Sequence, residues 1–169
     1  MTPIETARLT LVPMSREVAL ATLHDRAGLA RLLDASVPDD WPGPDLAGWL
    51  PALARDLERD PGFGEWVRLA IQTAKRRLVG DMGFHGPPNA VGTVEIGYII
   101  VAGARRQGYA SEGARALVDW AFARPDVRCV VARCAPDNAA SIRVLESLGM
   151  QRRPVLDAML HWELRRSGE

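Results

Sequence analysis

The sequence predicts one domain of mixed α/β (α+β) class, and three observations support this prediction. Residues 94–122 begin as an apolar, β-branched run and then place apolar side chains at every third or fourth position, the pattern of a strand followed by an amphipathic helix. Two apolar segments within residues 65–84, separated by a polar turn, indicate a hairpin. A strand-like run at 128–134 follows the helix and completes a strand–helix–strand crossover.

In the N-terminal half we expect one strand and three helical segments. Residues 8–12 alternate polar and apolar side chains up to Pro13, which predicts a strand. Ser15 is a suitable N-cap for the helix that follows it. The expected helical segments are residues 15–23, 29–33 and 45–59, the last after a loop rich in proline and glycine.

The C-terminal half contains most of the expected strands. Asn138 is a suitable N-cap for a helix that runs to Leu148, where Gly149 ends it. The expected strands of this half are residues 65–73, 78–84, 94–101, 128–134 and 158–164. No repeat or linker interrupts the chain, so we expect a single domain over residues 1–169.

Composition excludes several classes of function. The 21 basic and 21 acidic residues balance, so the chain lacks the positive field of a general nucleic-acid binder. No apolar run is long enough to span a membrane, and the N-terminus has no signal-peptide core, so we expect a cytoplasmic protein. Cys129 and Cys134 lie five residues apart in one expected strand and point to opposite faces, so we expect both to be reduced.

The turn between the strand at 94–101 and the following helix is a candidate anion-binding site. The first N–H groups of a helix lack internal partners and lie at the positive end of its dipole, where a pyrophosphate can accept several of them. The turn adds two arginines, small residues and a hydroxyl. Its residues are Arg105, Arg106, Gln107, Gly108, Tyr109, Ala110 and Ser111. An ordinary loop before an amphipathic helix is the alternative interpretation.

Two common phosphate-binding motifs do not fit this turn. Gly108 and Gly113 have the spacing of a P-loop, but Ala114 and Arg115 stand where that motif requires lysine and a hydroxyl residue. The turn also lacks the G-x-G-x-x-G triplet of dinucleotide-binding folds. A nucleotide-phosphate binder is therefore the weaker interpretation.

The pattern Arg105-x-x-Gly108-x-Ala110 resembles the acyl-coenzyme A signature of the GNAT N-acetyltransferases. A second block, residues 130–150, resembles the RimJ/RimL-like branch of that family, which contains ribosomal-protein alanine acetyltransferases. Within this block the matching motifs are Asn138-x-x-Ser141 and Leu148-Gly149-Met150. Outside it, the same branch is resembled by VGDMGF at 79–84, EIGY at 95–98, GYASE at 108–112 and HWEL at 161–164. The resemblance extends over residues 65–165, the acyl-coenzyme A-binding core, whereas residues 1–64 correspond to the part that shapes the acceptor site.

The resemblance implies a mixed sheet of six or seven strands flanked by helices, whose central parallel strands, 94–101 and 128–134, splay apart. Acetyl-coenzyme A would enter the gap, with no metal. Its pantetheine arm would lie along Ile99, Ile100 and Val101, and its pyrophosphate would meet the amides of residues 106–111. Asn138 would contact the arm. The family also leaves a homodimer open.

The implied reaction transfers an acetyl group directly to a primary amine, either a protein N-terminus or a small molecule. It needs a proton acceptor, a donor to the thioester oxygen, which backbone N–H groups near Ile99 would supply, and a group that stabilises the thiolate. Glu95, a carboxylate in an apolar strand, is the candidate base, and the alternative is that it points to solvent or pairs structurally with an arginine. Ser141 is the candidate donor to the leaving sulfur, and pure helix capping is the alternative.

Two residues are candidates for binding the acceptor. His85 follows an expected strand next to that of Glu95, whereas His24 and His161 are scattered and have no metal-binding spacing. Trp41, with the acidic residues Asp39, Asp40 and Asp45 nearby, would form an aromatic mouth attractive to a cation, and a solvated loop is the alternative. The rival to an enzyme is an acyl-coenzyme A-binding sensor without catalytic activity.

Overall fold

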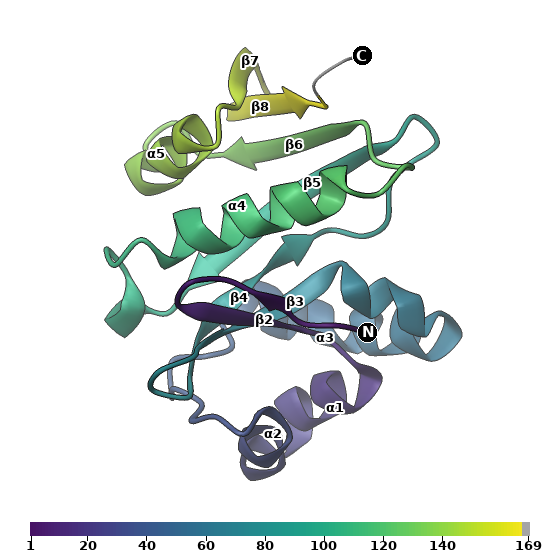
Figure 1. Ribbon diagram of the computed structural model, residues 1–169, viewed down its shortest axis with the longest axis vertical. Coiled ribbons are helices and arrows are strands. Elements are labelled where there is room, and N and C mark those ends of the chain that lie inside the picture. The colour runs from purple at the N-terminus through teal and green to yellow at the C-terminus, as the bar shows by residue number, and fades with distance from the viewer. Residues whose placement is uncertain (167–169) are drawn as a thin grey trace.

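The computed structural model describes residues 1–166. The strands are β1 (Ile4–Glu5), β2 (Leu9–Pro13), β3 (Val67–Gln72), β4 (Arg77–Phe84), β5 (Thr93–Ile100), β6 (Cys129–Cys134), β7 (Gln151–Leu156) and β8 (Met159–Arg165). The helices are α1 (Arg16–His24), α2 (Arg26–Leu33), α3 (Pro44–Arg59), α4 (Tyr109–Phe122) and α5 (Ala139–Ser147), with short 3-10 turns η1 (Pro61–Glu65) and η2 (Ala102–Ala104). The strand order in the sheet is β1-β2-β3-β4-β5-β6-β8-β7. Figure 1 shows α4 in front of this sheet and α3 behind it.

The mixed sheet is confirmed, but within residues 1–166 it has eight strands where six or seven are expected. β1 contains two residues, which is too short to produce a hydrophobic period. β7 is exposed along its whole length and contains two arginines and Pro154, so its sequence resembles that of a loop. It forms because it lies at the edge of the sheet, where a proline removes no ladder hydrogen bond.

The central parallel strands separate after three residues. β5 pairs with β6 only from Thr93 to Glu95. Beyond Glu95, β5 continues along β4 alone, and β6 continues along β8 alone. Two strand edges therefore face each other across a gap, which confirms the expected splayed arrangement. All other neighbouring strands in the described sheet are antiparallel.

The start of α4 is fixed by contacts with the short segment between β1 and β2. The Glu112 carboxylate accepts hydrogen bonds from Thr6 Oγ1 at 2.6 Å, from the Arg8 backbone N–H at 2.7 Å and from Arg8 Nε at 2.7 Å. Burial raises the pKa of Glu112, but these hydrogen bonds outweigh it and hold the pKa below its usual value. Because Glu112 lies in the first turn of α4, this cluster holds the helix N-terminus against β2.

We expect Glu112→Gln to lower the free energy of unfolding by about 1–3 kcal/mol at pH 7, because an amide NH₂ group, which can only donate, replaces one of the carboxylate oxygens that accept these hydrogen bonds. Folding lowers the pKa of this carboxylate, so its stabilisation is present above the unfolded-state pKa of about 4.3 and is lost as pH falls through the folded-state value. Urea denaturation from pH 7 down to pH 3 should show the difference from wild type shrinking. Glu146, an exposed residue of α5, provides the control Glu146→Gln, and equal losses in both variants would contradict the prediction.

Candidate active site

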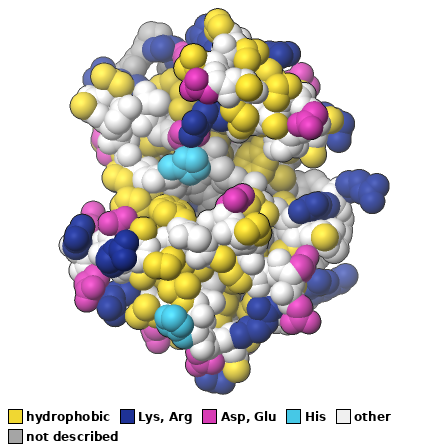
Figure 2. Space-filling view, turned by 180° about the vertical axis from the view of Figure 1, so that it is seen from behind, with side chains coloured by type: hydrophobic (Ala, Val, Ile, Leu, Met, Phe, Trp, Pro, Cys, Tyr) yellow, Lys and Arg dark blue, Asp and Glu magenta, His cyan; other side chains and the backbone are white. Residues whose placement is uncertain are grey.

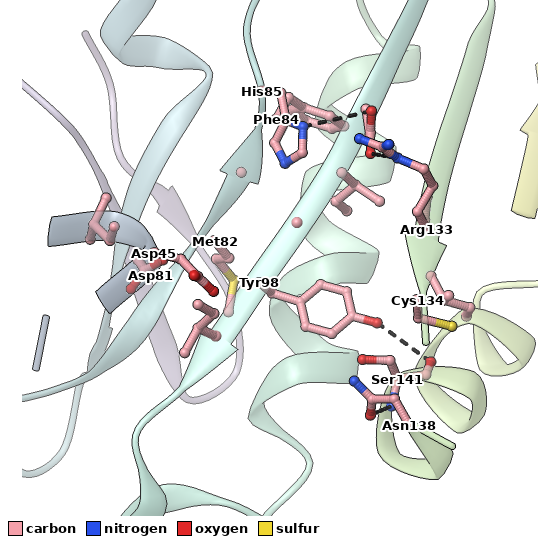
Figure 3. A pocket seen from close by; sticks show the side chains of 18 of the residues that line it. Asp45, Asp81, Met82, Phe84, His85, Tyr98, Arg133, Cys134, Asn138 and Ser141 are labelled. Atoms are coloured by element: carbon pink, nitrogen blue, oxygen red, sulfur yellow. Dashed lines mark hydrogen bonds and ion pairs between the residues drawn. The ribbon is translucent and has the colours of Figure 1, made fainter. Parts of the chain in front are cut away.

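A cavity of about 740 Å³ occupies the gap between β5 and β6. Its walls come from both halves of the chain, because α3 and β4 line one side and β6 and α5 line the other. Figure 2 shows the molecule from behind, hollowed between its two ends, with apolar, acidic and histidine side chains around the hollow. Figure 3 shows three groups of polar side chains around the cavity: His85 with Arg133, Asp81 with Asp45, and Tyr98 with Ser141 and Asn138.

The backbone of β5 alternates between two directions. The His85 N–H donates to the Glu95 carbonyl at 2.9 Å, and the Val101 N–H donates to the Val79 carbonyl at 3.0 Å. In an antiparallel pair every second residue bonds to the neighbouring strand, so the odd-numbered residues of β5 direct their backbone groups to β4. The even-numbered residues near the end of β5 therefore direct theirs into the gap.

Tyr98 and Ile100 consequently have backbone groups that face the cavity side. The Ile100 carbonyl accepts a hydrogen bond from Arg105 Nε at 2.9 Å. Of the three residues expected along a pantetheine arm, only Ile100 faces the gap, because the backbones of Ile99 and Val101 face β4. The donors that the sequence placed near Ile99 are thus those of its two neighbours.

The basic turn has the arrangement that the sequence predicts. Gly108 is the N-cap of α4 with a φ of 82°, and no side chain caps the helix, so its first N–H groups remain available. A Cβ at Gly108 would lie 3.2 Å from Arg8 Nη2, and Arg8 also donates to the Gln107 carbonyl at 2.8 Å. Tyr109 differs from expectation, because its side chain is buried and its hydroxyl accepts from Gln72 Nε2 at 2.7 Å. Only its backbone can take part in the turn.

Asn138 and Ser141 lie at the start of α5 and line the cavity. The Asn138 Oδ1 accepts from the Ser141 N–H at 3.0 Å, which confirms Asn138 as the N-cap. The Ser141 hydroxyl makes no hydrogen bond to any described residue. Tyr98, which had no predicted role, donates its hydroxyl hydrogen to the Ser141 carbonyl at 3.5 Å. Burial raises the pKa of Tyr98 to about 12, so its phenol stays protonated at neutral pH.

Glu95 lines the cavity as expected and also makes the arginine pair that was the alternative interpretation. Its Oε1 lies 2.7 Å from Arg133 Nε, and its Oε2 lies 3.6 Å from His85 Nδ1. His85 lines the same cavity, which agrees with its predicted position. The geometry brings these three side chains together, and the role of Glu95 as a base stays a prediction.

Asp81 also lines the cavity, although it was not among the site residues predicted from the sequence. It lies in the middle of β4, directly across from Ile99. Its Oδ1 accepts a hydrogen bond from Trp41 Nε1 at 2.8 Å. Burial raises the pKa of Asp81 to about 6, the Trp41 hydrogen bond opposes that rise, and the negative charge of Asp45 adds to it. The signal in the sequence was the one used for Glu95, a carboxylate within an apolar run.

The aromatic mouth expected around Trp41 does not form. Trp41 is 1% exposed, so its ring packs in the core and only its indole N–H acts on the cavity, through Asp81. Asp39 is exposed and lies 3.5 Å from Arg26, and Asp40 accepts a hydrogen bond from the Ala102 N–H. Asp45 alone of these acidic residues lines the cavity, from the first turn of α3.

Other expectations concern residues outside the cavity centre. Both cysteines are free and buried, as expected, and Cys134 lines the cavity. His24 ends α1, and His161 lies near the Leu156 carbonyl, at a second cavity beside β7.

Within residues 1–166 no group of three or more potential ligands has the arrangement of a metal site. None of the described helices is both long and apolar enough to cross a membrane.

Comparison with known proteins agrees with this geometry. The family model described as acetyltransferase (GNAT) domain matches residues 8–151. YjdG of Bacillus subtilis (strain 168), an uncharacterized N-acetyltransferase, is 31% identical over 152 residues, which cover 88% of this chain and 89% of YjdG.

Solved structures share the fold at low sequence identity. The ribosomal-protein-S5-alanine acetyltransferase of Vibrio fischeri has a TM-score of 0.70 at 13% identity, covering 99% of this chain and 98% of that one. RimL, a ribosomal L7/L12 α-N-protein acetyltransferase solved with coenzyme A, has a TM-score of 0.67 at 18% identity, covering 99% of both chains. With the family model spanning most of the sequence, this chain belongs to the GNAT acetyltransferase family and is an acyltransferase.

Proposed function

We propose that this protein transfers an acetyl group from acetyl-coenzyme A to a primary amine. The observation that carries the proposal is the gap between β5 and β6 together with the chain connection from the end of β5, through η2, to the uncapped N-terminus of α4. A pantetheine arm has amide groups that can hydrogen-bond to an unpaired strand edge, as an added strand does. The pyrophosphate would then reach the first N–H groups of α4, where two exposed residues, Arg106 and Gln107, flank it. RimL, which shares the fold, was solved with coenzyme A.

In this proposal the thioester lies in the cavity, where each demand of acyl transfer has a candidate group. The gap-facing N–H groups of Tyr98 and Ile100 would donate to the carbonyl oxygen as negative charge develops on it. The free hydroxyl of Ser141 would donate to the departing sulfur. Glu95 would accept a proton from the amine through a water molecule. No step requires a nucleophile from the protein.

The acceptor would enter from the side of α3, since residues before β3 supply that wall. This agrees with the proposal that residues 1–64 form the acceptor side and residues 65–165 form the acyl-coenzyme A core. The wall combines Asp45 with the apolar side chains of Leu46 and Trp49. Such a surface suits an amine carried on a partly apolar group, either a small molecule or the N-terminus of a protein.

The experiment that tests the function is coenzyme A release from acetyl-coenzyme A, screened over small amines and short peptides. A blank without substrate corrects for the thiols of Cys129 and Cys134. Direct binding of acetyl-coenzyme A is measured in parallel by calorimetry. Release that depends on one acceptor supports the proposal and identifies the substrate class. Absence of acetyl-coenzyme A binding would overturn it.

We expect Glu95→Gln to lower turnover of the best acceptor by about 100-fold or more, because general bases contribute on the order of 10²–10⁴. Since Glu95 also pairs with Arg133, the matched control is Arg133→Gln, which removes the ion pair and keeps the carboxylate. A catalytic role predicts a much larger loss in Glu95→Gln than in Arg133→Gln. Similar losses in the two variants would show that the pair is structural.

Ser141→Ala should lower turnover by about 10-fold or more while the affinity for acetyl-coenzyme A changes by less than about 3-fold, since a donor to the leaving sulfur acts mainly in the transition state. The control is Ser147→Ala in the same helix, whose hydroxyl donates to the Val144 carbonyl at 2.7 Å, away from the cavity. Equal losses of rate and affinity in Ser141→Ala would assign this residue to capping and binding alone.

A further inference from the structure

The face of the sheet that looks towards α3 has a regular order of side chains along the cavity. Residues directly opposite each other in an antiparallel pair share a face, and every second residue returns to it. Asp81 and Ile99 form one pair on this face, and Gly83 and Gly97 form the next. The third pair on this face is His85 and Glu95, joined by a backbone hydrogen bond of 2.9 Å.

Gly83 and Gly97 form a floor between the two carboxylates, and the His85 ring leans over part of it, because a Cβ on Gly97 would lie 3.3 Å from His85 Nε2. Gly83 and Gly97 line the cavity and have no side chains to fill it. Each row of side chains lies two residues from the next, which is about 7 Å along a strand. A group placed over the glycine pair is therefore within reach of Asp81 on one side and of Glu95 on the other.

The two carboxylates have different partners. Glu95 has both oxygens near cationic or ionisable groups, Arg133 and His85. Asp81 Oδ1 accepts the indole N–H of Trp41, the backbone N–H of Asp81 itself also stabilises the carboxylate, and Asp81 Oδ2 makes no hydrogen bond to another described residue. No arginine, lysine or histidine of the described chain forms an ion pair with Asp81. Trp41 thus fixes the carboxylate in place and leaves one oxygen for a ligand.

We propose that Asp81 is a catalytic residue that contacts the acceptor nitrogen over the Gly83–Gly97 floor and takes the first proton from its ammonium group. This assignment rests on the proposed acetyl transfer. The ammonium N–H bond breaks and its proton moves to Asp81 Oδ2, which frees the nitrogen lone pair. The nitrogen then forms a bond to the thioester carbon. As the C–S bond breaks, the second proton leaves the nitrogen through water to Glu95. One of the two protons finally goes to the coenzyme A thiolate and the other to solvent.

The surroundings of Asp81 suit this exchange. Its pKa of about 6, raised mainly by burial, is close to neutral pH, where a general base works best. Leu69 of β3 and Ile99 of β5 are its cross-strand neighbours, and both are apolar. From α3 the charged neighbour is Asp45, which raises this pKa further. Two rows farther along the face lie His85 and Glu95, and Arg133 of β6 forms an ion pair with Glu95. Activity should therefore require ionised Asp81 and fall as pH drops through about 6.

The test is the pH dependence of kcat/KM for the best amine. We expect Asp81→Asn to lower kcat/KM at pH 7 by about 100-fold or more and to remove the acidic limb near pH 6. The residual activity should then rise with pH as the free amine fraction increases. Binding of acetyl-coenzyme A should stay within about 3-fold of wild type. Asp119→Asn, an exposed position of α4 outside the cavity, should change neither the rate nor the limb.

Two further variants keep the assignment falsifiable if Asp81→Asn folds poorly. Asp45→Asn removes the charge that raises the pKa of Asp81, so the acidic limb should move to lower pH. Glu95→Gln should be slower but retain the limb near pH 6, since that limb belongs to Asp81. An unmoved limb in Asp45→Asn, or Asp81→Asn with wild-type kcat/KM at pH 7, would overturn the role of Asp81. By contrast, wild-type protein without amine-dependent coenzyme A release would overturn the proposed reaction itself.

Discussion

The structure depends on the loss of pairing between β5 and β6 after Glu95. A strand edge inside a sheet normally has its N–H and C=O groups satisfied, and leaving them unpaired in an apolar interior is costly. Here β4 and β8 hold the outer edges of the two strands, so the inner edges can separate without loss of the sheet. The unpaired groups then border a cavity that water or a ligand can enter. The same separation gives α5 and α3 a space to line from opposite sides.

A second constraint follows from burying a carboxylate in that space. An ionised group with little access to water is costly unless it has partners, and Asp81 has only the indole N–H of Trp41 and its own backbone N–H as donors among the described residues. Stabilising contacts elsewhere in the fold offset the free-energy cost of burying Asp81. One example is the set of three hydrogen bonds from Thr6 and Arg8 to Glu112, which fix the start of α4. Perturbed carboxylates of this kind concentrate at functional sites, where their altered proton affinity is useful. The position of Asp81 in the cavity of an acyltransferase fits that pattern.

Most of the fold could be predicted because its elements carry strong local signals. The hydrophobic period predicted α3 and α4, the caps Ser15 and Asn138 marked the starts of α1 and α5, and the crossover indicated the parallel pair. β7 was missed because an exposed edge strand has no hydrophobic period to detect. In the site, Glu95 could be predicted because it is a carboxylate in an apolar run. Asp81 carries the same signal within VGDMGF at 79–84, but that segment was used only for its resemblance to the family and Asp81 was not predicted. The burial of Trp41 depends on how a proline-rich loop packs against β4, which no local pattern specifies.

The arrangement of Asp81 and Glu95 is consistent with the amine acceptor proposed for this cavity. A primary ammonium group must lose two protons in becoming an amide, and a single carboxylate would have to discharge the first before accepting the second. Two carboxylates on one face, separated by a glycine floor, can take one proton each. The two carboxylates have different surroundings. Glu95 lies beside the guanidinium of Arg133, whereas Asp81 has apolar neighbours and lies near the negative charge of Asp45. An alcohol or thiol acceptor has one proton to lose and would need only one of them. If Asp81 and Glu95 act as proposed, the pair favours nitrogen as the atom that receives the acyl group.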